Sequence, residues 1–134
     1  MTLYADASAI MKLYLAEPDS DVAQVTLRGD PEWISACLTL VEVRRNLARL
    51  LEGEDLTRAR AELLQDWSEV VSIALDESMS ERAALLAETT GVRTLDALHL
   101  AAAENAGGGE LPMVTFDQRL ADAARSLGWT VLGA

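Results

Sequence analysis

The sequence is poor in the residues that build disulfides, zinc sites and membrane spans. Cys37 is the only cysteine, so no internal disulfide can form, and a single cysteine is typical of a reducing, cytoplasmic location. The one histidine cannot form a zinc site of clustered cysteine and histidine. Apolar runs such as residues 83–87 are far shorter than the ~18 residues of a membrane span. The N-terminus also lacks a basic segment, so we expect neither a membrane anchor nor a signal peptide.

Basic residues are scarce as well. The chain has 22 Asp and Glu against 11 Lys and Arg, which gives a formal net charge of −11 and a pI near 4.4. A field of this sign repels polyanions at long range, which disfavours a nucleic-acid-binding protein built around a basic groove. It favours a basic partner or a bound cation. The alternative is that the acidic residues serve only solubility.

Half of the 134 residues are hydrophobic, and short apolar segments alternate with helical patterns. The predicted strands are residues 2–6, 32–35, 70–74, 111–116 and 130–132. The predicted helices are residues 8–15, 20–27, 38–51, 56–67, 80–90, 95–106 and 118–127. This alternation indicates an α/β fold with a mainly parallel five-stranded sheet and helices on both faces. The length predicts one domain over residues 1–134.

Four acidic residues fall at one edge of such a sheet. Asp6 and Asp117 follow the first and fourth predicted strands. Asp96 lies in the first turn of a helix, and Glu42 lies in the second turn of another. In a parallel α/β sheet, the carboxyl ends of the strands and the N-termini of the following helices share an edge, where function gathers. We therefore expect these carboxylates to converge although they are far apart in the sequence.

Asp6, Asp117 and Glu42 each have a purely structural alternative. Asp6 and Asp117 are natural N-caps for the helices that follow them. Glu42 shares a helix face with Arg45 and Arg49, which is also the pattern of a solvated stripe with helical ion pairs. On periodicity alone these alternatives remain open.

Asp96 is harder to explain as a surface residue. Its predicted helix, residues 95–106, is apolar nearly all round over residues 95–103, which is typical of a buried helix. A first-turn dipole interaction is one explanation, but a buried carboxylate must be paired or become neutral. Several carboxylates in one place cannot all stay ionised unaided, and a divalent cation resolves their repulsion. The candidate ligands are all carboxylate oxygens, which indicates Mg²⁺ or Mn²⁺.

The residues around the four acids resemble the motifs of a known family. The blocks are residues 4–9 (YADASA), 40–43 (LVEV), 94–101 (TLDALHLA) and 114–117 (VTFD). Together and in this order, they are similar to those of PIN-domain ribonucleases, specifically the small VapC-type toxins of bacterial toxin–antitoxin pairs. The resemblance covers the whole chain.

The resemblance implies an α/β/α sandwich and a metal-dependent endoribonuclease. Such enzymes hydrolyse RNA phosphodiester bonds with water activated by Mg²⁺ or Mn²⁺, leaving a 3′-hydroxyl and a 5′-phosphate. The catalytic and metal-binding quartet implied here is Asp6, Glu42, Asp96 and Asp117. Of these, Asp6 and Asp96 are the expected direct ligands. Ser8 and Thr115 match small polar positions that would support the quartet by holding a water or fixing a carboxylate rotamer.

The resemblance also implies partners. VapC-type toxins usually form homodimers, and a cognate antitoxin with a basic tail neutralises them, which agrees with the charge of −11. RNA would then dock on a local basic patch, for which Lys12, Arg45 and Arg49 are the main candidates. His99 lies on the same helix face as Asp96, and we expect a buried histidine satisfied by a neighbour rather than a functional group.

Two other classes of function stay open on the sequence. An aspartyl phosphotransfer domain has a similar topology, but a phosphatase of this kind needs a second Asp two residues after Asp6, where Ser8 stands. A non-catalytic binding or dimerisation module would use the four acids only as caps and surface charges.

Overall fold

The computed structural model describes residues 2–30 and 32–134. The strands are β1 (Thr2–Ala5), β2 (Glu32–Ala36), β3 (Val71–Ile73), β4 (Met113–Thr115) and β5 (Val131–Gly133). The α-helices are α1 (Ala7–Ile10), α2 (Ser20–Arg28), α3 (Leu38–Leu50), α4 (Gly53–Trp67), α5 (Glu77–Thr90), α6 (Thr94–Ala106) and α7 (Gln118–Ser126). Two 3₁₀-helices cover Met11–Leu13 and Gly108–Glu110. No helix of the described residues is long and apolar enough to cross a membrane.

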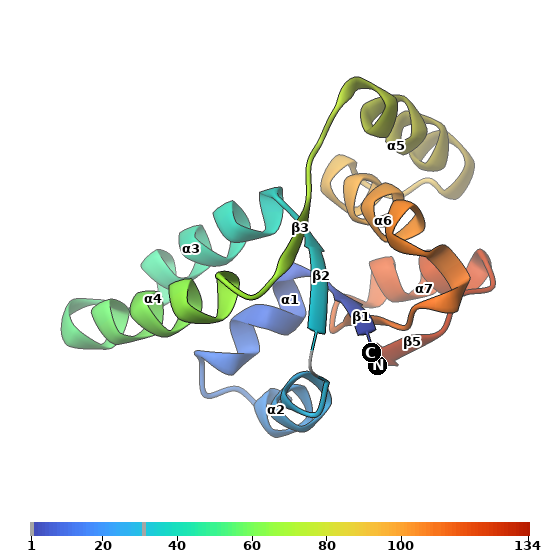
Figure 1. The fold of residues 1–134 in the computed structure, drawn as a ribbon. Coiled ribbons are helices and arrows are strands. Elements are labelled where there is room, and N and C mark those ends of the chain that lie inside the picture. The colour runs from blue at the N-terminus through green and yellow to red at the C-terminus, as the bar shows by residue number, and fades with distance from the viewer. Residues whose placement is uncertain (1, 31) are drawn as a thin grey trace.

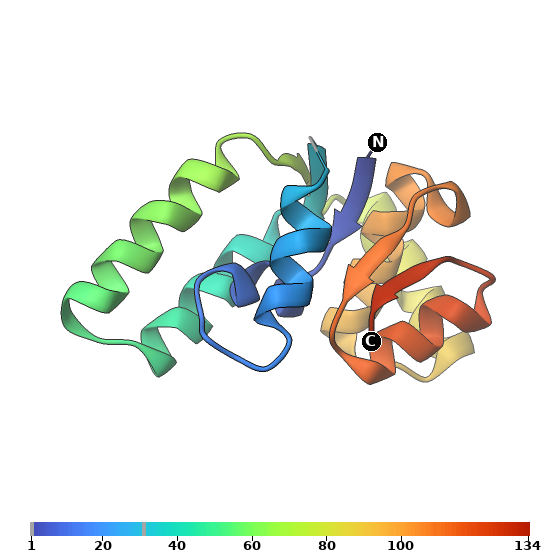
Figure 2. The ribbon, with the colours of Figure 1, turned by 90° about the horizontal axis from the view of Figure 1, so that it is seen from below.

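The strands form one sheet in the order β3-β2-β1-β4-β5, and all four strand pairings are parallel. Helices α1 to α4 lie on one side of the sheet and α5 to α7 on the other, as Figures 1 and 2 show. The predicted α/β sandwich around a five-stranded parallel sheet is therefore confirmed.

Alternating side chains of β1 build a separate hydrophobic core on each face of the sheet. Leu3 and Ala5 pack with α1, α2, α3 and α4, whereas Tyr4 packs with α5, α6 and α7. Successive side chains of a strand point to opposite faces, so a strand with both faces covered is apolar at most positions. Helix α6 is buried at seven positions, including Asp96 and His99, because it packs against both the sheet and α5.

The predicted elements all exist, with strand ends shifted by one or two residues, but three helix predictions have wrong ends. The helix predicted over residues 8–15 is α-helical only over Ala7–Ile10 and then tightens into a 3₁₀ turn. Helix α5 begins at Glu77 rather than at residue 80, because Asp76 caps it by accepting a hydrogen bond from the Met79 amide at 2.8 Å. Helix α4 begins at Gly53, three residues before its predicted start at residue 56.

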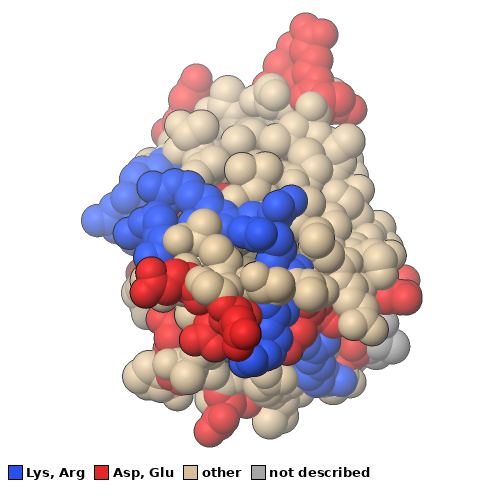
Figure 3. Space-filling view, turned by 90° about the vertical axis from the view of Figure 1, so that its left-hand side faces the viewer, with Lys and Arg blue, Asp and Glu red and all other residues tan. Residues whose placement is uncertain are grey.

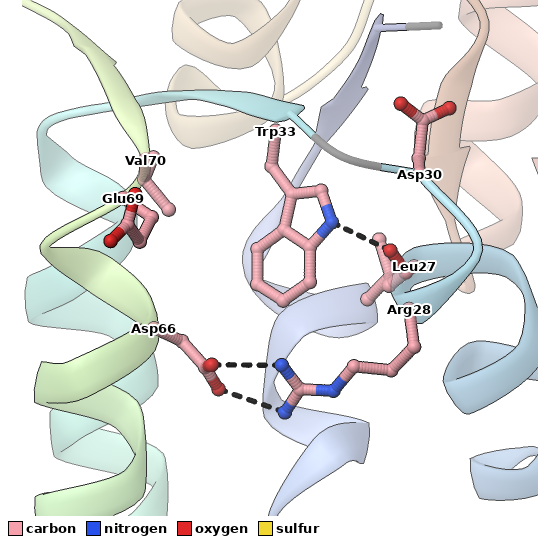
Figure 4. Close-up of a pocket in the computed structure, with 7 residues that line it drawn as sticks. All are labelled: Leu27, Arg28, Asp30, Trp33, Asp66, Glu69 and Val70. Atoms are coloured by element: carbon pink, nitrogen blue, oxygen red, sulfur yellow. Dashed lines mark hydrogen bonds and ion pairs between the residues drawn. The ribbon is translucent and has the colours of Figure 1, made fainter.

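A polar cluster that we call the Asp66 clasp joins three helical segments near the amino edge of the sheet. The Arg28 guanidinium donates to both carboxylate oxygens of Asp66 at 2.8 and 2.9 Å, and the Tyr14 hydroxyl donates to the same group at 2.6 Å. Arg28 also lies 5.4 Å from the ring centroid of Trp33, whose indole N–H donates to the Leu27 carbonyl (Figure 4). The clasp ties α2 and α4 to the segment after α1.

Replacing Asp66 tests the clasp. We expect Asp66→Asn to lower the free energy of unfolding by about 1–3 kcal/mol at pH 7, because hydrogen bonds to a charged group are lost. Burial alone would raise the pKa of Asp66, but the hydrogen bonds from Arg28 and Tyr14 outweigh it and hold the pKa below its usual value. A carboxyl group whose pKa is lowered by folding stabilises the folded state at pH values above its unfolded-state pKa. This stabilisation is lost as the pH falls through the folded-state pKa. The difference between the wild type and the variant in the free energy of unfolding, measured in urea, should therefore become smaller below about pH 4.

Asp55→Asn on the same helix is the matched control. Asp55 forms an exposed ion pair with Arg58 at 3.6 Å, and such pairs contribute about 0–1 kcal/mol. Equal losses for the two variants, or a gap that does not change with pH, would contradict the clasp.

Candidate active site

The order of the strands creates a crevice at the carboxyl ends of β1 and β4. Strand β1 lies between β2 and β4, and the chain reaches these neighbours over opposite faces of the sheet. Ligands of open α/β sheets bind at such a switch point, outside the carboxyl ends of the strands. Asp6 follows β1 directly, and Thr115 is the last residue of β4.

Asp6 is fixed in place by three donors. Its side chain is buried, at 4% exposure. Oδ1 accepts from the Ser8 hydroxyl at 2.7 Å and from the Ala9 amide at 3.0 Å, while Oδ2 accepts from the Thr115 hydroxyl at 2.7 Å. Asp6 is thus the N-cap of α1, so the capping alternative is correct and is compatible with a place in the site. Burial raises the pKa of Asp6, although nearby His99 and these hydrogen bonds oppose the rise.

Ser8 and Thr115 also join the first and fourth strands. Their hydroxyl oxygens lie 3.2 Å apart. The Phe116 amide donates to Ser8 at 2.9 Å, and the Asp117 amide donates to Thr115 at 3.1 Å. These contacts hold the turn after β4 against the start of α1, and the two hydroxyls orient the Asp6 carboxylate.

Asp96 is the acid whose charge the protein compensates least. It lies in the first turn of α6 and is buried, at 8% exposure. Its buried Oδ2 has no hydrogen-bond partner among the described residues. Burial and then the negative charge of Asp117 raise the pKa of Asp96, and the Arg93 charge opposes them. A buried carboxylate oxygen without a partner costs free energy unless a ligand compensates it.

Asp117 and Glu42 border the same space. Asp117 caps α7, since its Oδ1 accepts from the amides of Arg119 and Leu120 at 2.9 and 3.3 Å. Glu42 projects from α3, and its Oε1 lies 2.7 Å from Nε2 of His99. The capping alternative therefore holds for Asp117 too, whereas Glu42 pairs across the sheet edge with α6 rather than along its own helix.

An open cleft of about 1090 Å³ is lined by Glu42, Asp96 and Asp117, whereas Asp6 is not among its lining residues. Side chains from α3, from the start of α6 and from the start of α7 line it. Its polar lining consists of Glu42, Arg45, Asn46, Arg49, Arg93, Thr94, Asp96 and Asp117. Figure 3 views the molecule from the side of α3 and α4, where Lys and Arg gather in a band next to acidic side chains. This face thus carries a local group of basic side chains despite the acidic total.

Lys12 is placed differently from Arg45 and Arg49. Its ammonium lies 3.4 Å from Glu17 and 3.7 Å from Asp19, and 5.2 Å from the ring centroid of Phe116. The Lys12 side chain is only 12% exposed and does not line the cleft. Its charge is already engaged within the protein.

The acids fit a metal ion that keeps much of its own water. Among residues 2–30 and 32–134, no three His, Cys, Asp or Glu side chains form a ready-made metal cluster. The oxygen-only acid set and the unpartnered Oδ2 of Asp96 fit Mg²⁺ or Mn²⁺, since Mg²⁺ takes one or two carboxylates and retains waters.

His99 has more partners than the sequence suggested. It is buried, as predicted, at 2% exposure. Its two ring nitrogens contact Tyr4 and Glu42, so one of its satisfying neighbours is a site residue. Burial lowers the pKa of His99, but the Glu42 hydrogen bond and the charges of Asp6 and Asp96 outweigh it, so the net shift is upward. The helical spacing to Asp96 was the one signal in the sequence, and no local pattern indicated Tyr4.

A second cavity, of about 210 Å³, lies at the Asp66 clasp (Figure 4). It is lined by Leu27, Arg28, Asp30, Trp33, Asp66, Glu69 and Val70. It shares no lining residue with the acidic cleft, and Arg28 and Asp66 already satisfy each other there. The acidic cleft is therefore the candidate active site.

Comparisons of the sequence with a family model and with known proteins indicate the same family. A family model of the PIN domain matches residues 3–126. Ribonuclease VapC46 of Mycobacterium tuberculosis (strain ATCC 25618 / H37Rv) is 35% identical over 130 residues, which cover 97% of this chain and 95% of the relative. Ribonuclease VapC45 of Mycobacterium tuberculosis (strain CDC 1551 / Oshkosh) is 32% identical over 137 residues, which cover 98% and 95%.

Solved structures share the fold. The crystal structure of Mycobacterium tuberculosis VapC20, described as a sarcin-ricin loop cleaving toxin, has a TM-score of 0.72 at 18% identity and covers 90% of this chain and 94% of its own. FitAcB from Neisseria gonorrhoeae has a TM-score of 0.71 at 20% identity, covering 98% and 96%. Identities this low support the fold alone. The match to the PIN-domain model and the VapC relatives each span nearly the whole sequence, and the chain therefore belongs to the PIN-domain family, in its VapC branch.

Proposed function

We propose that this protein is a metal-dependent endoribonuclease toxin that hydrolyses RNA phosphodiester bonds and is neutralised by a cognate antitoxin. The observation that carries the proposal is the unpartnered, buried Oδ2 of Asp96, in a cleft that Glu42 and Asp117 also line and beside the fixed carboxylate of Asp6. Relatives named as ribonucleases support RNA as the substrate.

Mg²⁺ or Mn²⁺ is the proposed cofactor, with Asp6 and Asp96 as direct ligands and Glu42 and Asp117 completing the site directly or through water. When bound, such an ion activates a water for attack on phosphorus and stabilises the leaving oxygen. Asp6 retains the capacity to act as a ligand, because Oδ2 accepts one protein hydrogen bond and a carboxylate oxygen has two acceptor sites.

The remaining residues of the site position its parts and the substrate. Ser8 and Thr115 keep the Asp6 carboxylate in one orientation. Arg45 and Arg49 on α3 are exposed along the cleft and would bind RNA phosphates. The alternative of an aspartyl phosphotransfer domain is disfavoured because Ser8 stands two residues after Asp6, where a phosphatase of this kind needs a second Asp.

The proposed partners follow from charge and from the relatives. A net charge of −11 attracts a basic antitoxin tail, and an arginine guanidinium can take the place of a cation between carboxylates. One structural relative is a complex of a toxin–antitoxin system, VapBC-5 from Mycobacterium tuberculosis. A homodimer and a cytoplasmic location belong to the same proposal.

Replacing Asp96 distinguishes effects on activity and metal binding from effects on folding. Asp96→Asn should reduce cleavage of an RNA substrate about 100-fold or more, since losing even an outer partner of a metal ligand costs 10–100-fold. Mg²⁺ or Mn²⁺ at millimolar concentration should raise the melting temperature of the wild type, because an ion that binds only the native state stabilises it, and should not raise that of the variant. Without metal, Asp96→Asn should melt higher than the wild type, because a neutral amide removes a buried charge beside Asp117.

Asp55→Asn is the control, because Asp55 is also a first-turn helix aspartate but is exposed on α4. It should cleave RNA and respond to metal like the wild type. Full activity of purified Asp96→Asn, or equal metal-induced shifts in both variants, would refute the proposed site.

Replacing Arg45 tests the path of the RNA. Arg45→Gln, compared in the Asp96→Asn background, should weaken binding of a single-stranded RNA at low salt and reduce the slope of log affinity against log salt by about 1. Arg58→Gln makes the same change in net charge outside the cleft and should leave the slope nearly unchanged. Lys12→Gln should have less effect than Arg45→Gln, because Lys12 is engaged by Glu17 and Asp19. Similar slopes for Arg45→Gln and Arg58→Gln would show that RNA does not follow α3.

A further inference from the structure

A chain of hydrogen bonds runs from the hydrophobic core through Tyr4 and His99 to Glu42 in the cleft. It begins at Tyr4 in β1, which is fully buried against α5, α6 and α7. The Tyr4 hydroxyl lies 2.8 Å from Nδ1 of His99, and the two rings meet edge to face with centroids 6.0 Å apart. Nε2 of His99 lies 2.7 Å from Oε1 of Glu42, whose side chain is 23% exposed and lines the cleft.

The chemistry of these groups determines the direction of the chain. A carboxylate only accepts hydrogen bonds, so Nε2 must carry the proton that is shared with Glu42. In the neutral ring Nδ1 is then an acceptor, and the Tyr4 hydroxyl donates to it. In the doubly protonated ring Nδ1–H donates to the hydroxyl oxygen instead, and Nε2–H still donates to Glu42. Both forms of the ring therefore hold Glu42 in the same way.

We propose that His99 is a positioning residue that holds Oε1 of Glu42 through Nε2–H, leaving Oε2 as the oxygen that Glu42 offers to the cleft. This inference rests on the proposed function. Glu42 needs such an anchor more than Asp6 does, because it stands on a long side chain with several rotatable bonds. Tyr4 acts one step further back, since its rigid place in β1 fixes the ring of His99. A hydrogen bond of this kind to a metal-binding carboxylate orients the ligand and tunes its affinity.

The alternative is that His99 merely fills the core. The two roles differ in which ring nitrogen matters. A packing role depends on the ring and on its burial, whereas the positioning role depends on a donor at the place of Nε2. Two polar substitutions separate these positions: the amide of glutamine reaches the place of Nε2, and the shorter amide of asparagine reaches only the place of Nδ1, near Tyr4.

The experiment compares His99→Gln with His99→Asn in the full chain. Affinity for Mn²⁺ is measured by calorimetry, RNA cleavage by initial rate, and stability by urea unfolding. We expect His99→Gln to stay within about 3-fold of the wild type in Mn²⁺ affinity, and His99→Asn to lose about 10–100-fold in both affinity and cleavage. In a Glu42→Ala background, His99→Asn should cause no further loss of affinity, because the two changes remove one interaction.

The outcomes decide between the roles. Equal losses of Mn²⁺ affinity for both variants, or losses that follow only their stabilities, would overturn the proposal. A further loss in the Glu42→Ala background would also overturn it. If wild-type protein neither binds Mn²⁺ nor cleaves RNA, the proposed function fails instead. Nitrogen-15 NMR of His99 then tests the anchor alone: a protonated Nε2 whose resonance shifts in Glu42→Ala supports it, and an unprotonated Nε2 refutes it.

Discussion

The buried carboxylates at one edge of the parallel sheet are the feature on which the rest of the site depends, because burying a negative charge costs free energy. Asp6 and Asp96 are both buried there, and burial raises the pKa of each. The fold compensates the two charges unequally. Asp6 receives three hydrogen bonds from residues of α1 and β4, whereas Oδ2 of Asp96 receives none from the described residues. The negative charge of Asp96 is therefore left without a hydrogen-bond donor at Oδ2, and a cation bound in the cleft can compensate it.

Much of this arrangement could be predicted from the sequence because it follows from topology. Apolar segments that alternate with helices require a parallel sheet, and such a sheet brings Asp6, Asp96 and Asp117 to one edge whatever the details of packing. The capping roles of Asp6 and Asp117 were also visible, since Asp is common at helix starts. The capping roles of these two residues are compatible with the site roles proposed for them.

What the sequence could not predict are contacts between distant side chains. Tyr4 and Glu42 meet at His99, and no local spacing relates the three. The engagement of Lys12 by Glu17, Asp19 and Phe116 likewise depends on how the 3₁₀ turn after α1 packs against the end of β4. Helix starts were missed where a cap was not recognised, as with Asp76 before α5. These errors share one physical cause: propensity and periodicity describe a segment, whereas partners are chosen in three dimensions.

The double role of Asp6 limits how its position can vary. One oxygen of its carboxylate begins α1 by accepting the Ala9 amide, and the other joins that helix start to β4 through Thr115. A substitution of Asp6 therefore alters the local backbone and the buried charge together. Oδ2 of Asp96 accepts no hydrogen bond from the described residues, so shape and charge can be varied separately at Asp96 but not at Asp6.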